Sequence, residues 1–172
     1  MSTYIPARMS LAWALFDLVA DPETHVAIDE QGGIAELVAL ATSGTEGQQE
    51  EAAAALWGLA ANADNQIAIA DQSGIAPLVA LATSGTGKQK EVAAGALSNL
   101  AINTDNKVKI ARQGGIAPLV ALATSGTDGQ KEMAAKALAN LAAFDVDNKV
   151  DIAKQGGIAP LVALATSGTD GQ

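Results

Sequence analysis

The sequence predicts an all-α protein built as a solenoid of repeated helical units, and three observations lead to that prediction. Two short motifs recur along the chain: TSGT at 42–45, 83–86, 124–127 and 166–169, and GIA from Gly33, Gly74, Gly115 and Gly157. Both recur at spacings of 41, 41 and 42 residues, a period typical of helical repeat arrays. Within each unit the apolar residues follow a helical period. Finally, 49% of the 172 residues are hydrophobic but only 3% are aromatic, which predicts a core of alanine, leucine and valine.

The periodicity predicts one solenoid domain, residues 1–172, divided into units. Three full units cover 34–74, 75–115 and 116–157, and partial units cover 7–33 and 158–172. The single extra residue of the third full unit lies in AAFDVDNK, 142–149, whose counterpart AINTDNK is one residue shorter. An insertion of this kind is expected in a loop.

A helix of about ten residues is predicted within each unit around the segment GIAPLVALA. In one copy its apolar residues fall at i, i+3, i+4 and i+7: Ile75, Leu78, Val79 and Ala82. Pro77 lies in the first turn, where its missing N–H removes no helical hydrogen bond. Pro118 and Pro160 repeat this feature.

A longer helix is predicted from about residue 87 to about 102, and its counterparts are expected to begin near residues 7, 46 and 128. Thr86 is expected to cap this helix, with Gln89 completing a capping box. Gly85 is expected to end the preceding helix in the left-handed conformation. The same capping pair recurs in two sister units, as Thr45 with Gln48 and as Thr127 with Gln130.

A short helix from Asn106 to Gln113 is predicted to complete the unit, with Val108, Ile110 and Ala111 inside. Gly114 and Gly115 are expected to close it. Each unit therefore contains three helices, of which the first is short and the third is the longest.

The stretch SGTGKQK, residues 84–90, raises the question of phosphate binding. A phosphate-binding loop has a glycine five positions before the glycine that precedes its lysine, and a Ser or Thr after the lysine. Ala82 and Gln89 occupy those positions here. The sister units hold Gly47 and Gly129 in place of Lys88, so the lysine is interpreted as a loop charge and a nucleotide enzyme is disfavoured.

The composition disfavours several other classes of function. The chain has no cysteine and only one histidine, His25, so neither a catalytic Ser/His/Asp or Cys/His set nor a metal site is expected, and no cofactor is predicted. The net charge of −9 argues against nucleic acid as a partner. No apolar run reaches membrane-spanning length, and no secretory signal is present, so we expect a cytoplasmic or nuclear protein that does not contact membranes.

The charge is polarised along the chain. Residues 1–87 carry eleven acidic residues and one basic residue, a net charge of −10, whereas residues 88–172 carry a net charge of +1. Such an asymmetry bears on partners and association rather than on the fold.

The repeated motif GGIAPLVALATSGTxxQKExAAxALxNLA resembles the consensus of the armadillo repeat family, from Arg8 onward. The resemblance implies a right-handed superhelix of three-helix repeats whose third helices line a concave groove. HEAT repeats are the alternative, disfavoured by the short, glycine-terminated first helix. The resemblance also implies a non-catalytic module that binds proteins or extended peptides, and the acidic half favours basic segments.

In peptide-binding members of the family, the groove carries an asparagine near the end of each third helix and a tryptophan four residues earlier. The asparagine position falls here on Asp17, Gly58, Asn99 and Asn140, and the tryptophan position on Trp13, Ala54, Gly95 and Lys136. No repeat keeps both residues, and the asparagines have an equally weighted alternative as solvated residues of an exposed helix face. The candidate groove residues are Trp13, Asp17, Glu50, Glu51, Asn99, Lys136 and Asn140. Trp57 and Phe16 lie next to the groove position and are interpreted as core residues.

The partial units at the two ends predict a second function, head-to-tail association into a homo-oligomeric scaffold. Residues 155–168 match residues 113–126 letter for letter, so the last unit has the sequence of a covered one. The candidate interface residues are Met9, Trp13 and Phe16 at one end and Ile158, Leu161, Val162 and Leu164 at the other. A fragment of a longer array is the alternative explanation.

Overall fold

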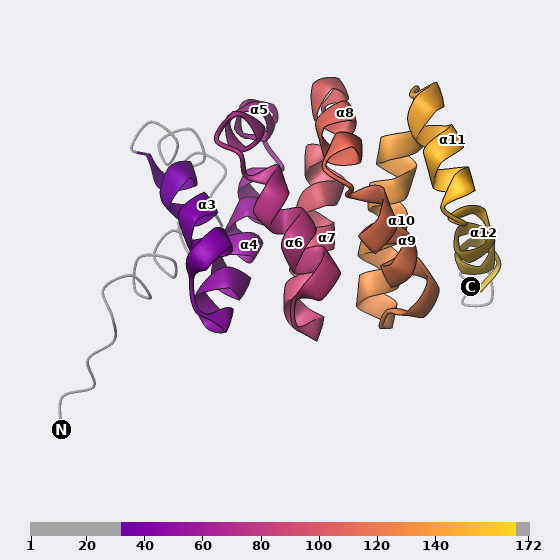
Figure 1. The fold of residues 1–172 in the computed structure, drawn as a ribbon, viewed down its shortest axis with the longest axis horizontal. Coiled ribbons are helices and arrows are strands. Elements are labelled where there is room, and N and C mark those ends of the chain that lie inside the picture. Colours follow the sequence, from indigo (N-terminus) through magenta and orange to yellow (C-terminus); the bar gives the residue numbers. More distant parts are fainter. Residues whose placement is uncertain (1–31, 168–172) are drawn as a thin grey trace.

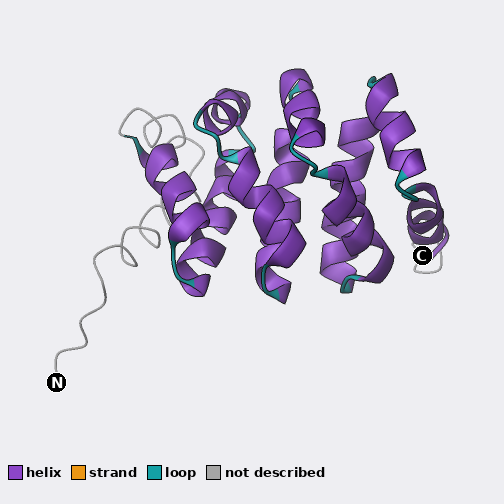
Figure 2. Ribbon diagram, in the orientation of Figure 1, coloured by secondary structure: helices purple, strands orange, loops and turns teal. Residues whose placement is uncertain are grey.

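The computed structural model describes residues 32–167 and places them in ten helices, with no strand in that range (Figure 1, Figure 2). The helices form three rows along the long axis, as an α-solenoid does. The first helices of the units are α5 (Ala63–Asp71), α8 (Thr104–Arg112) and α11 (Val146–Lys154). The second helices are α3 (Gly33–Ser43), α6 (Ile75–Ser84), α9 (Ile116–Ser125) and α12 (Ile158–Ser167). The third helices are α4 (Glu46–Leu59), α7 (Gly87–Leu100) and α10 (Asp128–Ala142).

The third helices begin at the predicted residues, because a threonine caps each of them. Thr45, Thr86 and Thr127 each accept a hydrogen bond from the backbone N–H of the glutamine three residues later. The side chain of that glutamine accepts a hydrogen bond in return, as in Thr86 N to Gln89 Oε1, 2.8 Å. The three predicted capping boxes are confirmed, while the helix expected near residue 7 lies outside the described residues.

The turn between the second and third helices differs from the prediction. Gly85 does not adopt a left-handed conformation, because its φ of −69° and ψ of 175° are those of extended backbone. A Cβ at this position would lie 2.6 Å from Leu81 O and 2.8 Å from Gln89 Oε1. The glycine is therefore required by close approach of the capping glutamine and the preceding helix end, not by its backbone angles. Gly44 and Gly126 show the same close approach.

The left-handed residues lie instead in the turn between the first and second helices. Gly114 has φ 77°, and the next residue, Gly115, donates its N–H to Ile110 O at 2.9 Å, closing α8 as predicted. Gly156 repeats this geometry with φ 80°. In the preceding unit Ser73 takes the same place with φ 64°, in a region that favours glycine.

The first helices begin earlier than predicted and bury only one side. α8 starts at Thr104 because Asn103 accepts hydrogen bonds from the N–H groups of Asp105 and Asn106. Ile110 is fully buried and Ala111 is half-buried, but the prediction that Val108 lies inside is wrong, since its side chain is exposed. A helix on the edge of a solenoid has neighbours on one side only, so its outward positions remain in water.

The core lies mainly between the rows of second and third helices and runs continuously through the units. Its largest fully buried side chains come from equivalent positions: Ile69 and Ile110 from first helices, Ile34, Leu37, Ile75, Leu78, Ile116 and Leu119 from second helices, and Leu56, Leu59, Leu97 and Leu100 from third helices. Fully burying one such side chain stabilises the fold by about 1.5–3 kcal/mol. Alanines fill the space between them, which lets adjacent helices approach closely.

Hydrogen bonds from side chains join each unit to the next. Gln89 Nε2 donates to Glu46 O at 2.8 Å, and Gln130 Nε2 donates to Gly87 O at 2.7 Å. The glutamine that completes a capping box therefore also contacts the first turn of the preceding third helix. These bonds fix how far one third helix is shifted along its neighbour.

Candidate functional site

The third helices present a common surface, which we call the third-helix face and which points away from the viewer in Figure 1. α4 packs against α7, and α7 packs against α10. The candidate groove residues within the described part of the chain come from all three helices: Glu50 and Glu51 from α4, Asn99 from α7, and Lys136 and Asn140 from α10. Trp13 and Asp17 lie outside that part.

Asn99 is half-buried and bonded to the neighbouring helix. Its Nδ2 donates to Trp57 O in the last turn of α4, at 3.1 Å. That turn tightens at its end, because Ala61 N donates to Gly58 O rather than to Trp57 O. The asparagine therefore supplies a donor to a helix-terminal carbonyl that would otherwise lack one.

Asn140 repeats the arrangement one unit further along. Its Nδ2 donates to Ser98 O at 3.0 Å, where the backbone N–H of Ile102 has turned to Asn99 O. Neither asparagine is a fully solvated surface residue, because each is half-buried and donates to the backbone of the adjacent unit. Each carboxamide still has its oxygen and a second N–H with which to contact a ligand.

Trp57 lies between α4 and α7 and is half-buried against the core, as the sequence interpretation had it. Its ring packs directly on Gly95, where a Cβ would lie 2.6 Å from Trp57 Cε2. Gly95 is one of the positions at which the sequence resemblance implied a groove tryptophan. The indole that fills this space thus comes from the preceding helix.

Three glutamates form a row on the third-helix face that the sequence reasoning missed. Glu50, Glu91 and Glu132 recur every 41 residues, one in each third helix. Glu91 forms an ion pair with Lys88 at 2.8 Å, and Glu132 forms one with Lys136 at 2.6 Å. The regular spacing of 41 residues could have revealed this row, but the sequence reasoning selected only Glu50 and Glu51.

Glu51 occupies a position that is apolar in the sister repeats, where Val92 and Met133 stand. Its Oε2 is buried and has no hydrogen-bond partner in the range that the structure describes. Burial raises the pKa of the Glu51 carboxyl above its usual value, and the neighbouring negative charge of Glu50 raises it further. The negative charge of Glu51 therefore carries a free-energy cost, because its carboxylate is partly removed from water.

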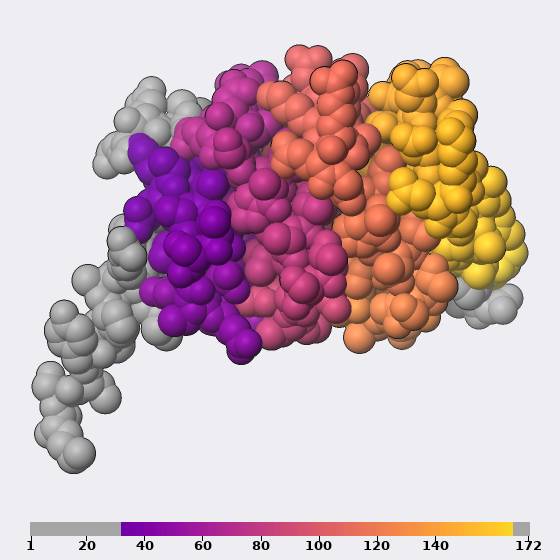
Figure 3. Space-filling view, in the orientation of Figure 1, coloured from indigo at the N-terminus to yellow at the C-terminus, as the bar shows by residue number. Residues whose placement is uncertain are grey.

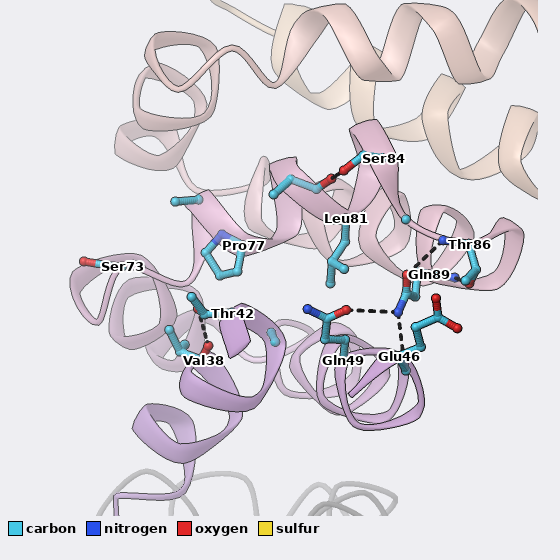
Figure 4. A pocket seen from close by; sticks show the side chains of 14 residues that line it. Val38, Thr42, Glu46, Gln49, Ser73, Pro77, Leu81, Ser84, Thr86 and Gln89 are labelled. Atoms are coloured by element: carbon cyan, nitrogen blue, oxygen red, sulfur yellow. Dashed lines mark hydrogen bonds between the residues drawn. The ribbon is translucent and has the colours of Figure 1, made fainter. Parts of the chain in front are cut away.

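A second kind of concavity lies between adjacent second helices. One groove of about 790 Å³ lies between α3 and α6 (Figure 4) and a second of about 580 Å³ between α6 and α9. Both are lined by equivalent residues one period apart, such as Pro77 and Pro118 at one wall and Gln89 and Gln130 at another. In the first groove Gln89 is already bonded to Glu46 O and to Gln49 Oε1. The grooves therefore recur because the units repeat, and the glutamine that lines the first groove already has hydrogen-bond partners within the protein.

Neither surface gathers the groups that catalysis by a metal requires. Among residues 32–167, no three or more His, Asp and Glu side chains converge in a way that could hold a metal ion. Over the same residues no single helix is long and apolar enough to cross a membrane. The pair α5 and α6 passes that test of length and composition only when both helices are taken together, and they meet at a bend of 84°.

The residues predicted to form the end-to-end interface differ in how exposed they are. On α12, Ile158 and Val162 are exposed, whereas Leu161 and Leu164 are half-buried against the core. Met9, Trp13 and Phe16, the candidates at the other end, lie outside the described residues.

Comparison with known families gives three consecutive matches. The armadillo/beta-catenin-like repeat matches residues 22–61, 62–102 and 103–143, which is more than half of the chain. The second and third matches each contain a first, a second and a third helix, so this division has the same period as the units 34–74, 75–115 and 116–157 but a different phase. No curated protein matches the chain.

Solved structures with the same fold include engineered proteins. One is 36% identical with a TM-score of 0.86, over 91% of this chain and 64% of its own length. Another is 35% identical with a TM-score of 0.90, over 97% of this chain and 41% of its own length. A designed armadillo repeat protein in complex with the peptide (KR)4 is 24% identical, with a TM-score of 0.83, over 89% of this chain and 65% of its own length. This chain thus spans less than two thirds of the length of each of the three.

Proposed function

This chain belongs to the armadillo/beta-catenin-like repeat family, and we propose that it is a non-catalytic scaffold that binds an extended, basic segment of a partner protein. The segment lies along the third-helix face, with micromolar or weaker affinity. A cytoplasmic or nuclear location remains part of this proposal.

The row of Glu50, Glu91 and Glu132 carries the proposal, because it places one carboxylate in each third helix along a path that a polypeptide can follow. Lysines of the same helices lie against the second and third of these carboxylates. A cation of the ligand must displace those lysines, but it meets Glu50 and Glu51 together on α4. The attraction is therefore strongest at α4 and weaker towards α10.

The asparagines supply the second part of the proposed contact. Asn99 and Asn140 are held by their bonds to the preceding helices, so little side-chain freedom remains to be lost on binding. Their remaining amide groups suit the N–H and C=O groups of an extended backbone. The designed armadillo repeat protein solved with (KR)4 supports this choice of ligand only through its fold, given its 24% identity.

The proposal is tested by titrating fluorescein-labelled (KR)4 and recording fluorescence anisotropy at low and moderate salt. Replacing the three glutamates by glutamine is expected to weaken binding, as is Asn99→Ala with Asn140→Ala. Binding is expected to fall as salt rises, because exposed charges are screened over about 10 Å at 0.1 M. The matched control removes the same number of charges elsewhere, by replacing Asp64, Asp105 and Asp147 of the first helices by asparagine.

Two outcomes contradict the proposal. If the glutamate and aspartate triple variants lose the same affinity, the peptide responds to net charge and has no site on the third-helix face. If (KR)4 does not bind at low salt, the face is not a site for basic segments at all.

Head-to-tail association is a second candidate function, which we propose because Ile158 and Val162 of α12 are exposed. Their counterparts on α9 are covered by neighbouring helices, and a helix pair of the same kind from another copy offers matching contacts. Light scattering of the wild-type chain is expected to show a mass above that of the monomer, and Val162→Glu is expected to abolish it. A wild-type chain that stays monomeric at its highest soluble concentration contradicts this candidate.

A further inference from the structure

The first helices α5, α8 and α11 lie side by side along one edge of the molecule (Figure 1, Figure 3). Each of the three exposes an apolar residue at the same repeat position. These residues are Ile67 of α5, Val108 of α8 and Val150 of α11. Isolated exposed apolar residues are normal on a protein surface. Three at one repeated position form a stripe, which we call the first-helix ridge.

The ridge becomes more apolar towards the C-terminal unit. One turn before the stripe residue, α5 has Ala63, α8 has Thr104 and α11 has Val146, which is also exposed. The loops that lead into α8 and α11 add two more exposed residues, Ile102 and Phe144. A cluster of exposed apolar side chains of this kind marks an interaction surface or a liability.

Phe144, in the loop before α11, is the exposed apolar residue that most strongly suggests a binding surface. It lies in the loop with the extra residue, its φ is 61°, and its side chain is fully exposed. A left-handed conformation is unfavourable for an aromatic residue and is tolerated only where the surroundings enforce it. Here the loop is held on both sides, because Lys107 Nζ donates to Ala143 O at 2.7 Å and Asp145 accepts from Asn148 N at 2.9 Å. The fold thus fixes an aromatic side chain in water.

The two sides of the stripe carry different charges. On the side of the helix N-termini stands one exposed aspartate per unit: Asp64, Asp105 and Asp147. On the other side stand Asp71, Arg112 and Lys154. Lys109 neutralises Asp71 through an ion pair at 2.9 Å, and Lys154 lies 4.0 Å from Asp151, so the net positive charge of this side comes from Arg112. The ridge is therefore an apolar stripe with an acidic edge and a weakly basic edge.

From these features we propose that the first-helix ridge binds an amphipathic helix of a partner protein, lying across α5, α8 and α11. Packed helices are about 8–10 Å apart, and seven residues of an α-helix rise about 10.5 Å. A partner helix with apolar residues repeating every seven positions therefore meets one ridge residue per heptad. Its basic flank faces the aspartates and its acidic flank faces Arg112, since Lys154 is already paired with Asp151. A uniformly basic peptide or a nucleic acid matches only one of the two edges.

The proposal is tested with a synthetic helical peptide of about three heptads, with leucine at the a and d positions, lysine on one flank and glutamate on the other. Binding is followed by fluorescence anisotropy, and its position is mapped by amide chemical shifts of the protein. We expect Val108→Gln with Val150→Gln to weaken binding at least about tenfold, as truncation of central apolar contacts does. The control variant Ala80→Gln with Ala121→Gln, at exposed positions of the second helices, is expected to change it less than about twofold.

Phe144→Gly gives a second measurement that does not depend on core packing. Glycine suits the left-handed backbone at this position, so the variant is expected to remain at least as thermally stable as the wild type while binding the peptide more weakly. A probe with exchanged flank charges is expected to bind more weakly than the original, because its charges then face like charges on the two edges.

Three results overturn the proposal: no binding at the highest soluble concentration, shifts that map outside the first helices, or equal binding by the ridge and control variants. Self-association of the wild type that is lost in Val108→Gln with Val150→Gln also overturns it, since the occupant is then a second copy.

Discussion

Helices α9 and α12 have the same ten-residue sequence, IAPLVALATS, but different surroundings. In α9 the side chain of Ile116 is 1% exposed and that of Val120 is 8% exposed. In α12 the equivalent Ile158 and Val162 are 59% and 57% exposed. The helix itself is the same in both places, although two of its apolar side chains are buried in α9 and exposed in α12.

The difference comes from the neighbours. α9 packs against α6, α10, α11 and α12. α12 packs against α9 and α10, and no other helix of the described range covers its far side. Because each unit of a solenoid buries its apolar surface only against adjacent units, one sequence yields a core helix and a surface helix. Four predictions test this comparison.

The largest effect is expected from removing the same side chain in both places. Ile116→Ala is expected to lower the free energy of unfolding by about 3 kcal/mol, because it leaves a cavity in the core. Ile158→Ala is expected to lower it by less than about 1 kcal/mol, because its side chain is largely in water. Chemical denaturation of the two variants gives both values. Equal losses would show that α12 is covered in solution, for instance by a second copy.

The contact between units can be broken directly at Gly95. A Cβ there would lie 2.6 Å from the ring of Trp57, so Gly95→Ala is expected to cost about 2 kcal/mol through overpacking. Gly47→Ala is the matched control, because no atom lies within 4 Å of the Cβ it introduces. Inside a helix that substitution is expected to stabilise by about 0.5 kcal/mol. Opposite signs in thermal unfolding support the contact, and a neutral Gly95→Ala contradicts it.

Equivalent turns in two units can be tested by exchanging their residues, and each substitution is expected to change the free energy of unfolding by about 1 kcal/mol. Ser73 and Gly114 occupy the same left-handed position, with φ of 64° and 77°. Ser73→Gly is expected to stabilise the protein, and Gly114→Ser is expected to destabilise it by a similar amount. Denaturation midpoints of the two variants measure the pair. If both substitutions shift the midpoint in the same direction, backbone conformation is not what distinguishes them.

The smallest effect is expected from a substitution of Glu51. The equivalent residue of the next unit is Val92, which is buried. Its pKa is raised above 4.5, so the folded state holds the proton more tightly than the unfolded state. Stability from this group is therefore present below pH 4.5 and is lost as pH rises through the folded pKa. Glu51→Gln is expected to raise the melting temperature at pH 7, by an amount that shrinks towards pH 4. A constant difference across that range would contradict the assignment to ionisation.

The repeated letters alone determined the helical class, the period and the start of the third helices α4, α7 and α10. The capping pair of Thr86 with Gln89 works through residues three apart, so it can be read without knowing the fold. The apolar faces of the second and third helices are equally local. The sequence also assigned Glu50, Asn99 and Asn140 to third helices, but it did not single out Glu91 or Glu132.

Only the tertiary structure decided what those residues contact. Asn99 and Asn140 donate to carbonyls about one unit away, and Gly85 is required by the approach of a capping side chain rather than by its own angles. Val108 is exposed although its apolar character predicted burial. Local hydrogen bonds and side-chain spacing fix a helix, but burial and polar partners depend on which helix lies beside it. In a repeat of near-identical units, that neighbour is set by a position in the array that no single unit encodes.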